Sequence, residues 1–178
     1  MKQSKKIFTR MLINNWGGIS HKVLEFHEYV NLFSGKSGSG KSTVMDAIQV
    51  LLYGSFSPAF LNKAADDAKN RRSVLNYLRG EQKDGTANRE GVDFCSTLVL
   101  EIEDTGTHSF TCVGVAFEVR RGDTEIKKYV FFSHAGQIPE NGYSNEQGYV
   151  YTNQEIRQLI DERAKSEESR TRDVNRIY

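Results

Sequence analysis

The chain has 178 residues, of which 38% are hydrophobic, 26% charged and 11% aromatic, a composition that fits one folded domain and excludes a disordered or collagen-like chain. Its 24 Lys and Arg residues nearly balance 23 Asp and Glu residues, so any surface for nucleic acid or membrane would be a local patch. No apolar run approaches the roughly 20 residues of a membrane span, and we expect a cytoplasmic protein without a membrane partner.

The first half of the chain predicts two strands, a glycine-rich loop and a helix. Residues 7–16 and 22–34 are rich in β-branched and aromatic side chains, and Gly17-Gly18 between them indicates a turn. From Ser42 onward, apolar residues recur at intervals of three and four until Gly54. This spacing predicts a helix that ends at Gly54.

Residues 55–90 form a polar stretch with seven basic and five acidic residues, and they predict an insertion with a short helix over 73–79. Residues 92–133 then predict an antiparallel meander of three strands, the last with Ile126, Val130 and Phe132 as its alternating apolar positions. The pattern changes phase near Cys112 and Gly114, where we expect a bulge or bend.

The last segment, 134–178, predicts a loop followed by a helix. Thr152 and Glu155 have the spacing of a capping box at the start of that helix, which becomes mostly charged beyond Asp161. The two cysteines, Cys95 and Cys112, lie in apolar strand-like runs without metal-ligand spacing, so we expect reduced, packed thiols.

Residues 35–42, GKSGSGKS, match the complete pattern G-x-x-x-x-G-K-[ST] of a phosphate-binding loop, and Thr43 follows. The predicted strand 30–34 precedes the loop and the helix follows it, which is the context this motif requires. Glycines allow successive backbone N–H groups to surround a phosphate, while the helix N-terminus adds positive charge. The residues predicted to bind nucleotide are Gly35, Lys36, Ser37, Gly38, Ser39, Gly40, Lys41, Ser42 and Thr43.

Within this loop the side chains have different expected roles. Lys41 supplies a full charge to the β- and γ-phosphates, and the Ser42 hydroxyl is a ligand for Mg²⁺. Thr43 is expected near the α-phosphate. The expected cofactors are therefore ATP and Mg²⁺. The four histidines are scattered without metal-ligand spacing, so we expect no further metal site.

The stretch 35–54, GKSGSGKSTVMDAIQVLLYG, closely resembles the Walker A region of SMC and ABC-type DNA-repair ATPases, in which G-K-S-[TSN]-x-x-D-A-I is usual. Residues 46–48, DAI, match that pattern, and residues 11–16 and 30–35 are similar to the first two strands of the same group. The pair Asn15-Trp16 and the long polar insertion look most like the MukB, MksB and JetC branch. These are bacterial condensin-like proteins that include the SMC component of the Wadjet plasmid-defence system.

The resemblance covers residues 7–133 in layout and is specific in its motifs over about 11–54. It implies an α/β P-loop NTPase fold, the N-terminal lobe of an ABC/SMC-type head with an antiparallel β subdomain. The implied lobe spans 7–133, with the P-loop at 35–43, the insertion at 55–90 and the meander at 92–133. Residues 134–178 would lead toward a coiled coil.

The sequence departs from a complete ABC-type head in lacking a Walker B Asp-Glu pair, a signature motif, a D-loop and a switch histidine. In SMC proteins those parts come from a distant C-terminal segment, so the chain looks like the N-terminal half of a split head. The resemblance implies the C-terminal half of the same head, a second head, kleisin-type and accessory subunits, and DNA as partners. It also implies a nucleoid-associated location, with negligible hydrolysis by the fragment alone.

Other functions remain open from the sequence. The nearest alternative is a RecF- or SbcC-like DNA-repair ATPase. A self-contained P-loop kinase needs lid arginines, and a GTPase needs N-K-x-D, which Asn62-Lys63-Ala64-Ala65 fails to match at its last position. A non-catalytic nucleotide-sensing module would bind ATP fully without a second half.

A few further residues are candidates for binding. Trp16 either stacks near adenine or packs in the core, and the second is favoured. Gln147, and by position also Gln137, is a candidate for the Q-loop residue that contacts Mg²⁺. If DNA is bound, basic residues of the insertion would meet its phosphates without reading bases: Lys63, Lys69, Arg71, Arg72 and Arg79.

Overall fold

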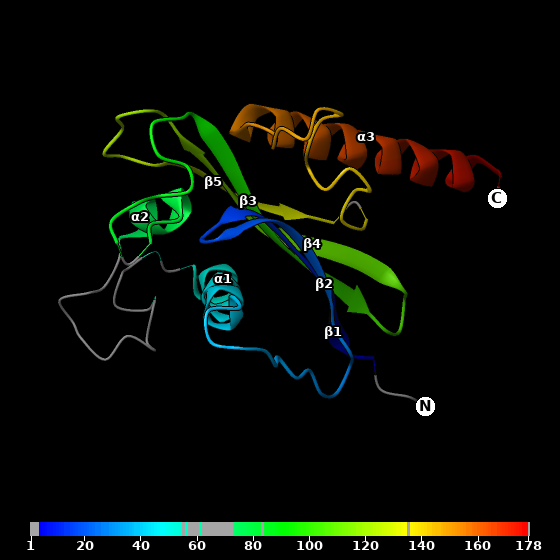
Figure 1. Ribbon diagram of the computed structural model, residues 1–178. Helices are drawn as coiled ribbons and strands as arrows, with labels where there is room; N and C mark the ends of the chain where they lie inside the picture. The colour runs from blue at the N-terminus through cyan, green and yellow to red at the C-terminus, as the bar shows by residue number, and fades with distance from the viewer. Residues whose placement is uncertain are drawn as a thin grey trace.

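The computed structural model describes residues 4–54, 56, 61, 73–82, 84–134 and 136–177 (Figure 1). Side chains of the last helix are described as far as residue 166. In chain order the elements are β1 (Lys6–Trp16), β2 (Ile19–Glu25), α1 (Lys41–Tyr53), α2 (Val74–Arg79), β3 (Phe94–Asp104), β4 (Ser109–Val119), β5 (Lys127–Ser133) and α3 (Asn153–Ile177).

The described strands form one five-stranded antiparallel sheet in the order β2-β1-β3-β4-β5. The β1–β2 hairpin turns at Gly17-Gly18, and β3, β4 and β5 follow one another as the predicted meander. Because β1 lies in register between β2 and β3, the N-terminal hairpin extends the meander instead of forming a separate sheet.

Two layers of helix cover the two faces of this sheet. Figure 1 shows α1 on one side and α3 on the other. Consecutive strand residues point to opposite faces, so Met11 packs with the α1 residues Val44 and Ala47, whereas Leu12 packs with Ile156 of α3. The strands of the centre are consequently apolar on both faces and buried.

The prediction of a strand over 22–34 was wrong in both bounds, because β2 begins at Ile19 and ends at Glu25. Residues 26–34 form no strand, although their composition favours one. A strand needs a neighbour to satisfy its backbone, and beyond the bond from Phe26 N to Thr9 O no described strand pairs with this segment. Instead the Asn31 side chain accepts from His27 N at 2.7 Å and donates to His27 O at 2.9 Å, which closes a local turn.

The bulge expected near Cys112 and Gly114 is absent, since the β3–β4 register runs unshifted along its whole described length. The register shift lies in β1 instead, between Phe8 and Arg10. Glycine at position 114 is explained by packing and not by a bulge. A Cβ placed there would lie 2.1 Å from Cζ of Phe131 on the neighbouring strand. The glycine leaves room for an aromatic ring.

The predicted phase of the last strand was also wrong. Phe131 and Ser133 are the buried residues of β5, whereas Val130 and Phe132 are 59% and 57% exposed. Tyr129 to Phe132 are all apolar or aromatic, so alternation along this strand gives no unique inward face. The contact between Phe131 and Gly114 fixes the phase.

The predicted helices are all present. Gly54 ends α1 in the left-handed conformation, and the Ser73 hydroxyl accepts from Asn76 N at the start of α2. At α3, Glu155 N donates to the Thr152 hydroxyl at 3.2 Å, and Thr152 N donates to Glu155 Oε2 at 2.7 Å, so the capping box is confirmed. None of the helices in the described part of the chain is both long and apolar enough to cross a bilayer.

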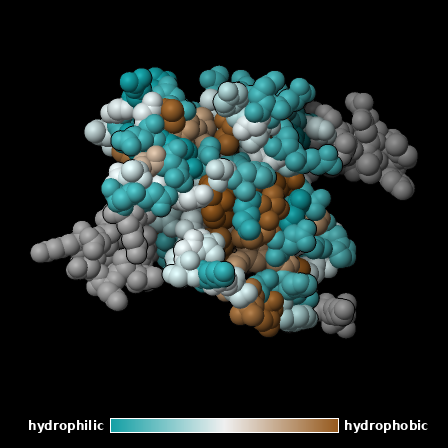
Figure 2. Space-filling view, in the orientation of Figure 1, coloured by the Kyte–Doolittle hydropathy of each residue, from teal (hydrophilic) through white to brown (hydrophobic). Residues whose placement is uncertain are grey.

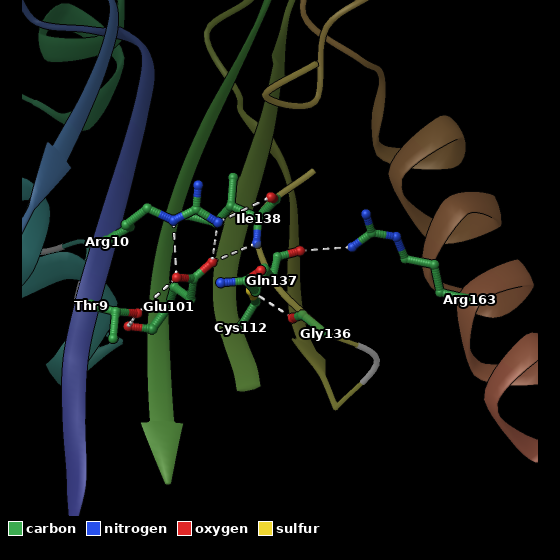
Figure 3. A network of polar contacts seen from close by, with 8 residues as sticks. All are labelled: Thr9, Arg10, Glu101, Cys112, Gly136, Gln137, Ile138 and Arg163. Atoms are coloured by element: carbon green, nitrogen blue, oxygen red, sulfur yellow. Dashed lines mark hydrogen bonds and ion pairs between the residues drawn. The ribbon is translucent and has the colours of Figure 1, made fainter. Parts of the chain in front are cut away.

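A buried carboxylate joins the sheet to the strap at residues 136–138 (Figure 3). Glu101 is 1% exposed and accepts four bonds: Arg10 Nε at 3.0 Å, Arg10 Nη2 at 2.6 Å, the Thr9 hydroxyl at 2.7 Å and Ile138 N at 2.7 Å. The strap is also bonded to α3, because Nη1 of Arg163 donates to Gln137 O at 2.9 Å. The strap therefore bridges the sheet and α3.

The cysteines are free thiols, as expected. Burial raises the pKa of Cys95 to about 11 and that of Cys112 to about 12. Both are protonated at neutral pH and unreactive as nucleophiles.

Candidate nucleotide-binding site

The glycine-rich loop joins the segment after β2 to the start of α1. Gly40 is the N-cap residue of α1 and has φ of 86°, a left-handed conformation that a residue with a side chain rarely adopts. Ser39 N donates to Lys36 O at 3.2 Å and closes a turn within the loop. The loop is therefore curled immediately before the helix begins.

The Lys41 ammonium is held over its own loop. Its Nζ donates to Gly35 O at 2.7 Å, to Lys36 O at 2.8 Å and to the Ser39 hydroxyl at 3.3 Å. These bonds join the first residue of α1 to the far end of the loop, so the chain surrounds a full positive charge. Residues 35–39 of the loop remain exposed to solvent.

The start of α1 is available to an anion. No side chain caps this terminus, and its first turn holds no acidic residue. First-turn amide groups have no acceptor within a helix, and the helix dipole adds partial positive charge there. Together with the Lys41 ammonium and the exposed Ser42 hydroxyl, these donors fit the phosphates and Mg²⁺ of a nucleotide.

Thr43 and Trp16 connect this terminus to the core. Trp16 is fully buried, packs against Tyr77 in a tilted ring pair with centroids 4.6 Å apart, and donates from Nε1 to Thr43 O at 3.1 Å. The packing role predicted for Trp16 is confirmed, and stacking on adenine is excluded because the ring is buried. The indole instead supports the first turn of α1, a role that no local sequence pattern indicates.

Asp46, part of the D-A-I sequence that matches the ATPase pattern, lies in the core. It is 5% exposed and accepts from the Tyr77 hydroxyl at 3.0 Å. This bond ties α1 to α2 across 31 residues of chain. The aspartate therefore orients the helix behind the phosphate-binding loop.

The structure does not bring the Q-loop candidates to the P-loop. Gln137 and Gln147 belong to the loop between β5 and α3, whose Ile138 and Tyr143 pack in the cluster on the sheet face opposite α1. The Gln137 carbonyl is bound to Arg163, and Gln147 is exposed in a turn closed by Asn145. This placement gives neither glutamine a contact with the proposed Mg²⁺ site.

Four of the five DNA-binding candidates, Lys63, Lys69, Arg71 and Arg72, lie outside the described residues. The fifth, Arg79, is half-buried at the end of α2 and donates from Nη2 to Asp123 O at 2.9 Å. Its guanidinium holds the β4–β5 turn.

Comparison with known proteins gives a family match over the P-loop, a curated relative and a solved structure. Residues 8–68 match a family model described as the P-loop containing region of AAA domain. A stretch of 74 residues is 40% identical to the SbcC component of the SbcCD nuclease of Staphylococcus haemolyticus and covers 39% of this chain. The chain spans only about 6% of the length of that relative.

A solved structure described as "Structural biochemistry of ATP-driven dimerization and DNA stimulated activation of SMC ATPases" is 14% identical and has a TM-score of 0.44. The similarity covers 87% of this chain and 98% of that one, and it is too low to identify a family by itself. The complete phosphate-binding motif and the match of residues 8–68 show that this part of the chain is a P-loop region, and the 74-residue stretch makes the chain similar to the SbcC component of the SbcCD nuclease.

Proposed function

We propose that this chain is the ATP-binding half of an SMC-like head, and that the head hydrolyses ATP only after pairing with a C-terminal lobe and a second head. One observation carries the proposal: α1 carries large apolar side chains on both of its faces, yet the described structure covers only one. Large apolar side chains exposed together on one helix face mark a surface that another part of an assembly covers.

The covered face of α1 comprises Val44, Ala47, Val50 and Leu51, which pack against the sheet. The other face carries Met45 and Leu52, seven residues apart and therefore aligned on one side of the helix, and they are 44% and 51% exposed. Tyr53 beside them is 74% exposed. These side chains support a second lobe seated against α1.

The segment before the P-loop supports the same proposal. Tyr29, Val30 and Leu32 are 80%, 75% and 88% exposed, and this β-prone segment has no described strand beside it. Figure 2 shows apolar side chains over the sheet and also where Figure 1 places the segment joining β2 to α1. A strand supplied by a C-terminal lobe would pair with this segment and cover it.

The residues of this half would bind the nucleotide rather than cleave it. The loop amides and Lys41 would hold phosphates, Ser42 would hold Mg²⁺, and bound Mg²⁺ would offset negative charge on the β- and γ-phosphates. Backbone amides at the start of α1 would orient the phosphate chain. The isolated chain would be nearly inactive, because the carboxylate that orients the attacking water would come from the C-terminal lobe.

The charge of Lys41 provides the direct test. Equilibrium binding of MgATP to Lys41→Ala, with the C-terminal lobe of the full-length protein present, should fall at least about tenfold, since a charged contact to phosphate contributes about 1.5–3 kcal/mol. The matched control is Lys22→Ala on exposed β2, which removes the same charge away from the loop. Undiminished binding by Lys41→Ala would contradict the proposal.

The full protein is proposed to act on DNA in the cytoplasm, with kleisin-type and accessory subunits, in chromosome organisation or plasmid defence. A second candidate is an SbcC-like repair ATPase, which the 40% identity to the SbcC component of the SbcCD nuclease favours. Purification of the full-length protein from its own cells discriminates between them. A co-purifying nuclease partner supports the repair function, whereas a kleisin-type partner supports the condensin-like function.

A further inference from the structure

The tip of the β1–β2 hairpin, Trp16–Gly18, lies directly beneath the first turn of α1. A Cβ at Gly17 would lie 2.8 Å from Cγ2 of Thr43, and the Trp16 indole already donates to Thr43 O at 3.1 Å. The backbone of the tip is therefore in van der Waals contact with the helix terminus that begins the phosphate site. A displacement of the tip would be transmitted to Thr43.

On its other side, the tip packs against the end of α2. Gly17 N donates to Tyr77 O at 3.1 Å, and a Cβ at Gly80 would lie 2.6 Å from Gly17 O. Neither glycine leaves room for a side chain. The tip is thus sandwiched between the first turn of α1 and the last turn of α2.

Arg89 closes this sandwich. It is 8% exposed, and its guanidinium donates from Nε to Leu78 O at 2.7 Å and from Nη2 to Gly17 O. The guanidinium also lies 5.4 Å from the centroid of the Phe94 ring. A single side chain therefore links a carbonyl at the end of α2 to a carbonyl of the hairpin tip.

The energetic cost of this arrangement distinguishes Arg89 from an ordinary surface arginine. Burial lowers the pKa of Arg89, and no salt bridge to it occurs among the described residues. A buried cation held by carbonyls is expensive, because carbonyl dipoles replace hydration only in part. An apolar side chain would fill the space with a smaller desolvation cost. The two bonds donated by one planar guanidinium therefore point to a need to hold Leu78 O and Gly17 O in a fixed relative position.

We infer that Arg89 is a positioning residue for nucleotide binding: by clamping the hairpin tip to the end of α2, it fixes the surface on which Thr43 and the first turn of α1 rest. The inference rests on the proposed function of the chain as an ATP-binding half. It assigns a role in that function to a residue that lies 48 positions beyond Lys41 in the sequence and whose guanidinium donates to Leu78 O and Gly17 O, outside the loop.

Trp16 provides the readout, because it is the single tryptophan of the chain and is bonded to Thr43. MgATP titrated into the whole chain, up to millimolar concentration, should change the Trp16 fluorescence. Arg89→Lys keeps the positive charge but loses the planar group that donates to two carbonyls. It should weaken MgATP binding about tenfold and alter the change in Trp16 fluorescence. Gly80→Ala, which pushes on Gly17 O without removing the guanidinium, should act in the same direction.

The control for general destabilisation is Ile156→Ala, which opens a cavity on the opposite face of the sheet. At a temperature where all variants are folded, Ile156→Ala should bind MgATP like the wild type. Wild-type affinity and fluorescence response in Arg89→Lys and Gly80→Ala would overturn the inference while leaving the proposed function intact. Failure of the wild type to bind MgATP, with or without the C-terminal lobe, would overturn both.

Discussion

At the scale of single residues, the polar groups of this protein fall into two sets with different origins. Lys41 and Ser42 belong to a local motif, and sequence alone identifies them. Glu101 and Arg89 act through partners far away in the chain, Arg10 being 91 residues from Glu101 and Gly17 being 72 residues from Arg89. No spacing rule links such pairs, because the sheet topology brings them together.

The Glu101 carboxylate predicts a specific dependence of stability on pH. Burial raises its pKa, but the bonds donated by Arg10, Thr9 and Ile138 together outweigh burial and hold the pKa below its ordinary value of 4.5. A lowered folded-state pKa stabilises the protein above pH 4.5, and this stability is lost as pH falls through the folded-state pKa. Chemical denaturation between pH 3 and 7 should therefore show a decrease at the acid end.

Glu101→Gln should lower the free energy of unfolding by about 2–3 kcal/mol at pH 7, because Arg10 loses its charged acceptor. The variant should also show a smaller loss of stability than the wild type on acidification. Glu103→Gln, on the same strand with its exposed partner His108, is the matched control and should change stability little. Equal acid dependence in wild type and Glu101→Gln would show that another group is responsible.

At the scale of elements, the contact between Gly114 and Phe131 makes a prediction about β4 and β5. Gly114→Ala should destabilise the protein by about 1–3 kcal/mol, because its methyl group would overlap the Phe131 ring. In a Phe131→Ala background the same change should cost much less, since the ring is gone. A double-mutant cycle by urea denaturation measures this coupling, and additive effects would contradict the packing described.

The elements also show what local pattern could predict. The helices were predicted well because their signals are local: Gly54, Ser73 and the Thr152–Glu155 pair each act within one turn. The strand predicted over 30–34 is wrong, since a strand requires a neighbouring strand and none is described there. The phase of β5 also escaped prediction, because a glycine on another strand decides which aromatic residue turns inward.

At the scale of the whole molecule, the uncovered side of α1 should make the isolated chain associate with itself. Exposed apolar side chains that a partner normally covers favour association in its absence. Tyr53→Ser should shift the chain toward monomer in analytical ultracentrifugation, and adding Leu52→Ser should shift it further. Tyr149→Ser is the control, because Tyr149 is 73% exposed against 74% for Tyr53 and belongs to the loop on the opposite face. Equal effects of Tyr53→Ser and Tyr149→Ser would contradict a specific covering surface.

The third helix has a mechanical consequence for any longer protein that contains this chain. Its 25 residues span about 37 Å, and among the side chains that the structure describes, as far as residue 166, those that hold it against the sheet lie in its first three turns, from Ile156 to Arg163. Figure 1 shows the remainder extending past the sheet. In a longer protein, a sideways load on this helix would reach the sheet through Ile156 and through the bond from Arg163 to the strap, on the sheet face opposite the phosphate loop.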